Sequence, residues 1–204
     1  MQRNTKPARE CPLFPLTVNV LPGGFLPLQI FEPRYLDMIS NCLGKEEGFS
    51  IVLLQAQVGG LQKDSIPNHF MVGTYVEVVD FNQLENGLLG ITVKGKNRIK
   101  VIERWSKKKD DLIMGSVINF EEEEESVSLE PKYENIWNLL REISSHPKIK
   151  SLDLDIDFKC SSSVVYNLAS LLPLTPPDRQ TLLETKSNTI RLDHLNQLVT
   201  KYGG

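Results

Sequence analysis

Residues 13–35 read LFPLTVNVLPGGFLPLQIFEPRY, and this stretch decides how the first half of the chain folds. Its first part, 13–31, is mainly apolar, but three prolines interrupt it, Pro15, Pro22 and Pro27. Because proline has no backbone N–H, these positions exclude a helix and confine any strands to short or edge positions. The stretch therefore predicts two short strands, over 13–20 and 26–31, joined by a turn at Gly23-Gly24.

The residues that follow predict a β-rich lobe with one helix inserted. Pro33 suits the first turn of a helix, and apolar residues at 36, 39 and 43 keep helical spacing up to Gly44. Further strand-like runs cover 49–54, 71–81, 88–93, 99–105 and 112–120. The Asn86-Gly87 dipeptide tolerates positive φ, so it predicts a hairpin between the second and third of these runs.

The second half changes to helical spacing. Five consecutive glutamates, 121–125, repel one another and predict a solvated connection. Apolar residues then recur at helical spacing from Ile136 to Ile143, and capping residues near Ser161, Thr175 and Ser187 predict three further helices. We divide the chain into a disordered tail (1–11), a β-rich lobe (12–120), an acidic connection (121–130) and a helical lobe (131–204).

Composition narrows the classes of function. The net charge is -3 and the isoelectric point about 5.7, which supply no general attraction to nucleic acid or anionic lipid. The three cysteines are far apart and form no Cys-x-x-Cys pair, and the three histidines are isolated, so we expect no disulfide framework, metal site or cofactor. Neither a signal peptide nor a run of about 18 apolar residues is present, so we expect a cytoplasmic protein outside the membrane.

Two partial motifs are interpreted as ordinary structure. Residues 90–97, GITVKGKN, approach a phosphate-binding P-loop, but Asn97 has no hydroxyl for Mg²⁺ and the apolar residues before it favour a strand. Asp153, Asp155 and Asp157 alternate like the start of a calcium-binding EF-hand loop, but Phe158 stands where that loop requires glycine. We expect a strand and an exposed polar segment, respectively.

The opening stretch also resembles a known family. Three segments closely resemble the opening of Lon substrate-binding domains, Leu13–Leu16, Leu21–Gly24 and Pro27–Tyr35. The resemblance extends from about residue 12 to about residue 199. It implies an α+β fold, in which a PUA-like β pseudo-barrel precedes a helical bundle. In Lon proteases this region precedes an ATPase and a peptidase; since the sequence ends at Gly204, we expect a free-standing, non-enzymatic relative without either.

Four residues near the barrel are candidates for a structural or binding role, Glu32, Arg34, Tyr35 and Arg98. We expect Glu32 to form a partly buried ion pair with one of the two arginines, pinning the helix to the barrel, with Tyr35 packed beside them. Direct contact with a ligand is the alternative. If the pair is buried, Glu32→Ala should cost on the order of 3 kcal/mol of stability.

Leu21, Phe25 and Leu26 are candidates for substrate binding. Prolines leave backbone groups unpaired beside these apolar residues, and such an edge suits an extended segment of another chain. The leading hypothesis is a module that binds polypeptide clients, such as unfolded proteins, or works with a protease partner. The alternative is RNA binding, a role that PUA-like barrels can serve, through the basic run Lys94, Lys96, Arg98 and Lys100.

Overall fold

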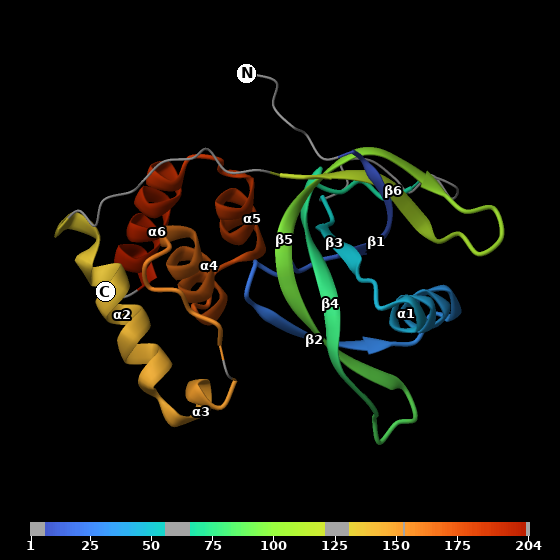
Figure 1. Cartoon of the computed structure of the whole chain (residues 1–204), viewed down its shortest axis with the longest axis horizontal. Coiled ribbons are helices and arrows are strands. Elements are labelled where there is room, and N and C mark those ends of the chain that lie inside the picture. The colour runs from blue at the N-terminus through green and yellow to red at the C-terminus, as the bar shows by residue number, and fades with distance from the viewer. Residues whose placement is uncertain (1–6, 56–65, 121–130, 153, 203–204) are drawn as a thin grey trace. The chain divides into compact units, whose positions relative to one another are not determined.

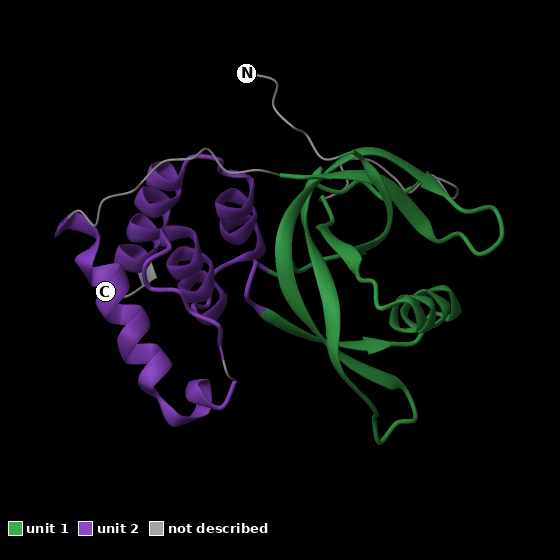
Figure 2. Ribbon diagram, viewed as in Figure 1, with its two compact units in different colours: residues 1–20, 25–120 green, residues 21–24, 121–204 purple. Residues whose placement is uncertain are grey.

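The computed structural model describes residues 7–55, 66–120, 131–152 and 154–202, so the predicted acidic connection and most of the predicted tail lie outside the described residues. The chain divides into two compact units (Figure 2). Unit 1 comprises residues 1–20 and 25–120, and unit 2 comprises residues 21–24 and 121–204.

Unit 1 is built on one mixed sheet (Figure 1). Its described elements are β1 (Arg9–Leu16), β2 (Phe25–Ile30), α1 (Pro33–Lys45), β3 (Phe49–Leu53), β4 (Val72–Gln83), β5 (Leu89–Ser106) and β6 (Ile113–Asn119). The strand order is β2-β5-β4-β3-β1-β6, and β5 also pairs with β6. That last pairing closes five of the strands into a ring, with β2 attached to β5, which confirms the expected pseudo-barrel. The β1–β3 pair is parallel and the other pairs are antiparallel.

The long strand β5 makes the closure possible because it changes partners along its length. Residues 89–94 pair with β2, and residues 99–106 pair with β6. A register shift between Val101 and Glu103 marks a bulge, a feature that bends a strand and increases its twist. This bulge is the physical reason for the imperfect alternation at 99–105, which belongs to the same strand as 88–93 rather than to a separate one.

Side chains on the two faces of β1 contribute to two different apolar clusters. Cys11 and Leu13 pack with Val52 and Ile99, whereas Phe14 packs with a second cluster that includes residues of α1. Cys11 is only 2% exposed. The strand therefore begins at Arg9, earlier than the predicted start of order at residue 12, because pairing with β6 and burial of Cys11 hold its first residues.

Unit 2 is helical, as the spacing predicts. After a short 3₁₀ turn its helices are α2 (Glu134–Ser145), α3 (Pro147–Lys150), α4 (Ser161–Leu171), α5 (Pro176–Glu184) and α6 (Asn188–Tyr202). The Thr175 side chain caps α5 by accepting from the Asp178 N–H. Fully buried Arg191 donates to Ser162 Oγ, Asn188 Oδ1 and the Thr185 carbonyl, and so links α4, α6 and the end of α5.

The proline-glycine turn belongs to unit 2, which differs from the predicted division at residue 131. Gly23 has φ +79, and a Cβ there would lie 3.4 Å from the Asn167 side chain. A Cβ on Gly24 would lie 2.7 Å from Ser170 Oγ. The two glycines thus allow the turn to approach α4 closely, and segment 21–24 packs with the helices.

Candidate functional site

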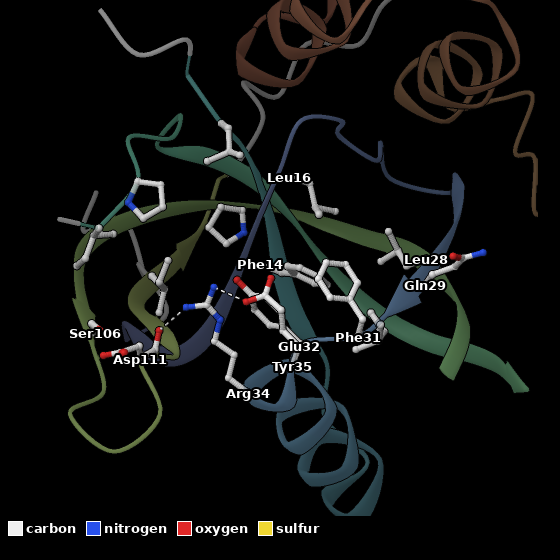
Figure 3. A pocket seen from close by; sticks show the side chains of 16 residues that line it. Phe14, Leu16, Leu28, Gln29, Phe31, Glu32, Arg34, Tyr35, Ser106 and Asp111 are labelled. Carbon is white, nitrogen blue, oxygen red and sulfur yellow. Dashed lines mark hydrogen bonds and ion pairs between the residues drawn. The ribbon is translucent and has the colours of Figure 1, made fainter. Parts of the chain in front are cut away.

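A cavity of about 600 Å³ opens in unit 1 where β1, the end of β2 and the start of α1 meet (Figure 3). We call it the β1–β2 pocket. Its lining residues come from four regions: Phe14, Pro15 and Leu16; Leu28, Gln29, Ile30, Phe31, Glu32, Arg34 and Tyr35; Leu54, Ile66 and Pro67; and Ser106, Asp111 and Ile113. A volume of this size lies within the usual range of ligand pockets, roughly 300–1,000 Å³.

Aromatic rings form one wall of the β1–β2 pocket. The rings of Phe14 and Tyr35 stack with centroids 4.1 Å apart and planes 25° apart. Both side chains are buried, and burial raises the pKa of the Tyr35 phenol above its ordinary value, so this wall is uncharged at neutral pH. Phe31, in contrast, is 68% exposed. The pocket therefore combines a fixed aromatic wall with a large apolar side chain that is open to solvent.

Charged groups form the other end of the pocket, where α1 begins. Arg34 Nη2 lies 2.6 Å from Glu32 Oε2, and Arg34 Nη1 donates to the Asp111 carbonyl at 3.2 Å (Figure 3). The guanidinium carbon lies 4.9 Å from the centre of the Tyr35 ring. Arg34 thus connects the first turn of α1 to the loop before β6.

The β1–β2 pocket brings together three of the predicted residues, Glu32, Arg34 and Tyr35. Arg98 lies elsewhere: it is 4% exposed and its guanidinium lies over the Phe120 ring at 4.9 Å. The arginine that pairs with Glu32 is therefore Arg34, because the two residues flank Pro33 at the helix start.

The three residues predicted to bind substrate, Leu21, Phe25 and Leu26, differ in burial. Leu21 is 1% exposed and belongs to unit 2, so its side chain does not contribute to an exposed patch. Phe25 and Leu26 are partly buried at the start of β2 and do not line the β1–β2 pocket. The Lys94 ammonium lies 5.4 Å from the centre of the Phe25 ring. The exposed aromatic residue at the pocket is Phe31, which the sequence marked only as the last residue of a strand-like run.

The two partial motifs have ordinary structural roles where the structure describes them. Residues 90–97 lie within β5, without the helix that a P-loop requires. The Asp157 carboxylate accepts from the Lys159 N–H at 2.8 Å in a turn. Among the described residues, no group of three or more His, Cys, Asp or Glu side chains is placed to hold a metal ion. Nor is any helix in that part of the chain long and apolar enough to cross a membrane.

The basic run of β5 does not form one open cationic strip. Lys94 lies over Phe25, and Lys96 Nζ lies 2.9 Å from Glu77 Oε2. Arg98 is buried. Three of the four cations thus have a partner or are buried within the protein, so the run gives RNA binding no support.

Comparison with protein families gives a match along nearly the whole chain. Residues 10–201 match the family model described as the ATP-dependent protease La (LON) substrate-binding domain. The Lon proteases of Rhizobium meliloti and Koribacter versatilis are 24% and 27% identical to the chain over 205 and 202 residues. Each alignment covers 95% of this chain but 24% of the relative, so the chain spans about a quarter of the length of these curated relatives.

Solved structures agree with the fold. The Lon N-terminal domain protein from Xanthomonas campestris is 28% identical, with a TM-score of 0.69, over 94% of this chain and 98% of that one. The N-terminal domain of the Mycobacterium avium complex Lon protease has the same TM-score, 0.69, at 15% identity, over 95% of this chain and 100% of that one. At that identity the second likeness concerns the fold alone.

Proposed function

The chain belongs to the ATP-dependent protease La (LON) substrate-binding domain family, and from this premise we propose that it is a non-enzymatic module that binds segments of other polypeptides in the β1–β2 pocket. The observation that carries the proposal is the pocket itself. Its walls are mainly apolar, and Phe31 exposes 68% of its surface beside them. Exposed apolar groups of this size around a cavity are typical of interaction sites.

The chemistry of the pocket favours weak and broad recognition. Full burial of one large apolar side chain contributes about 1.5–3 kcal/mol, and the pocket has room for few such side chains. The ordering of a flexible client opposes this gain. We therefore expect affinities on the micromolar scale, about -8 kcal/mol, for unfolded polypeptides with exposed apolar residues. A native protein, which buries those residues, should bind much less.

The polar groups in the pocket also suit binding better than catalysis. Ser106 is the lining hydroxyl of the nucleophile type, but no histidine or lysine is among the described lining residues. Serine nucleophiles are usually activated by such a neighbouring base. The Arg34 guanidinium is held by Glu32 and by the Asp111 carbonyl. These contacts support a pocket of fixed shape that holds a ligand.

Fluorescence anisotropy with two matched variants tests this proposal. The probe is a labelled protein, used once after reduction and carboxymethylation and once in its native form. Phe31→Asp places a charge in the pocket and should weaken binding of the unfolded probe about tenfold or more. Phe81→Asp is the control, because Phe81 is similarly exposed, at 61%, but lies on β4 outside the pocket lining.

Salt and RNA give two further tests. Because the contacts would be mainly apolar, the affinity for the unfolded probe should change little between low and high salt. RNA binding through phosphates would weaken steeply over the same range. Salt-sensitive binding of labelled single-stranded RNA, without preference for the unfolded probe, would contradict the proposal. Equal affinities of the Phe31→Asp and Phe81→Asp variants would show that the client binds elsewhere.

A further inference from the structure

Two strand edges that border the β1–β2 pocket have no strand beside them among the described residues. In β1, the first residues, Arg9–Pro12, pair with β6, whereas Leu13–Leu16 pair with β3 alone. The whole of β2, Phe25–Ile30, pairs with β5 alone. Residues 14–16 of β1 and 28–30 of β2 line the pocket, so these parts of the two open edges border it (Figure 3).

The open edge of β1 presents an acceptor without a matching donor. The Leu54 N–H donates to the Leu16 carbonyl at 2.8 Å, so the backbone polar groups of Leu16 face β3. Successive residues of a strand direct their backbone groups to opposite edges, so the Pro15 carbonyl faces the open edge. Pro15 has no N–H. Because its backbone groups face the open edge, this absence removes no hydrogen bond between β1 and β3. A ligand that supplies N–H groups would complement this edge.

The edge strand β2 also contains a proline in its centre, Pro27, a residue that edge strands tolerate because it has no N–H. Alternate side chains of the two strands then provide apolar surface: Leu16 on β1 and Leu28 and Ile30 on β2 line the pocket. An extended polypeptide repeats its side chains with a period of two residues and carries N–H groups on both edges. It therefore matches both the apolar surface and the carbonyl that faces the open edge of β1.

Charge complementarity further specifies the occupant. The charged side chains that line the polar end of the pocket are those of Glu32, Asp111 and Arg34, and Arg34 contacts the Glu32 carboxylate and the main-chain carbonyl of Asp111. These three side chains carry a formal charge of -1. A lysine or arginine beside the apolar residues of the bound segment would balance that charge, and the exposed ring of Phe31 offers a face for the same cation.

From these edges and charges we infer that the β1–β2 pocket binds its client as an added β-strand: an extended segment that donates main-chain hydrogen bonds, alternates apolar residues and carries a basic residue at one end. This inference rests on the proposed function and specifies how the same pocket would recognise a polypeptide. It also predicts a tolerance of client sequence, because main-chain groups are common to all sequences.

N-methylated peptides test the inference directly. The parent probe is a labelled ten-residue peptide of alternating leucine and threonine that ends in lysine. Two derivatives each carry N-methyl groups on two alternate central amides. In one derivative these amides lie on one edge of the extended peptide, and in the other derivative they lie on the opposite edge. A third carries one N-methyl group on the terminal lysine amide and controls for the added methyl itself. Anisotropy titrations with the whole chain should show that at least one central derivative binds about tenfold or more weakly than the parent and the terminal control.

The outcomes separate this inference from the proposed function. If the parent and both central derivatives bind equally well, the added strand is contradicted while polypeptide binding stands. If the unfolded protein probe binds but the parent peptide does not, the added strand is again contradicted. If neither the peptide nor the unfolded protein binds, both the inference and the proposed function fall. Replacement of the terminal lysine by glutamate should weaken the parent peptide, and tighter binding of the glutamate peptide would contradict the assigned occupant.

Discussion

Arg34 and Glu32 form an ion pair across Pro33, with 2.6 Å between Nη2 and Oε2, at the point where β2 ends and α1 begins. Their side chains are 32% and 38% exposed, so water reaches both groups. From the sequence we expected a partly buried pair whose disruption would cost as much as a stranded buried charge. Its partial exposure changes the expected energetics, because solvent screens the attraction and hydrates a partner that is left alone.

Glu32→Ala should therefore lower the free energy of unfolding by about 1 kcal/mol or less, rather than by the ~3 kcal/mol typical of a stranded buried charge. The measurement is the urea denaturation midpoint. Glu77→Ala is a matched control, since Glu77 pairs with Lys96 at 2.9 Å with similar exposure. A loss near 3 kcal/mol for Glu32→Ala alone would show that the pair contributes as a buried one.

Replacement by alanine should change the free energy of unfolding in opposite directions at two glycines that are close together in the sequence. Gly44 lies in α1, and a Cβ there would meet no atom within 4 Å, so Gly44→Ala should stabilise by about 0.5–1 kcal/mol through helix propensity. A Cβ on Gly48 would overlap the Val76 carbonyl oxygen, so Gly48→Ala should destabilise by about 1–3 kcal/mol or more. Thermal or urea unfolding of both variants checks this prediction. A change in stability of the same sign in both variants would contradict the described packing.

His69 should make stability depend on pH. Its side chain is 3% exposed, and burial lowers its pKa below the ordinary value of 6.5. Between the folded pKa and 6.5 the unfolded chain binds more protons, so stability rises with pH across this window. The contribution of neutral His69 is complete above 6.5 and is lost as pH falls from 6.5 through the folded pKa.

The free energy of unfolding should accordingly decrease on acidification below pH 6.5, by at most about 1.4 kcal/mol per pH unit for this one group. His69→Gln should reduce that slope, whereas His146→Gln, which replaces an exposed histidine, serves as the control. Urea titrations at several pH values measure the slope. If His69→Gln and the parent chain show the same pH dependence, His69 is not the responsible group.

Local sequence features predict much of unit 1 because they act over short distances. The prolines of residues 13–35 limit β1 and β2, Pro33 starts α1, and Asn86-Gly87 stands in the turn between β4 and β5. The helices of unit 2 follow from apolar spacing and caps in the same way. The order of the two kinds of lobe therefore follows from the sequence without knowledge of any tertiary contact.

The site is less predictable because its residues meet through tertiary pairing. Asp111 reaches Arg34 only because β5 and β6 fold back as a hairpin and β6 pairs with β1. No spacing in the sequence indicates that approach. Leu21 was misplaced for a related reason: its apolar character is evident, but its burial depends on the packing of segment 21–24 with the helices of unit 2. The sequence thus singles out Glu32, Arg34 and Tyr35 as candidates but gives no indication of the cavity that they line.

The central claim is that the β1–β2 pocket binds polypeptide, and amide hydrogen exchange with and without a saturating unfolded protein tests it most directly. The account predicts slower exchange on binding in peptides that cover residues 13–16 and 25–31, with little change in α4 and α6 of unit 2. At a probe concentration near the Kd of the parent chain, Phe31→Asp should remove most of that protection, and Phe81→Asp should retain it. Protection confined to unit 2, or unchanged exchange around β1 and β2 despite saturation, would contradict the account.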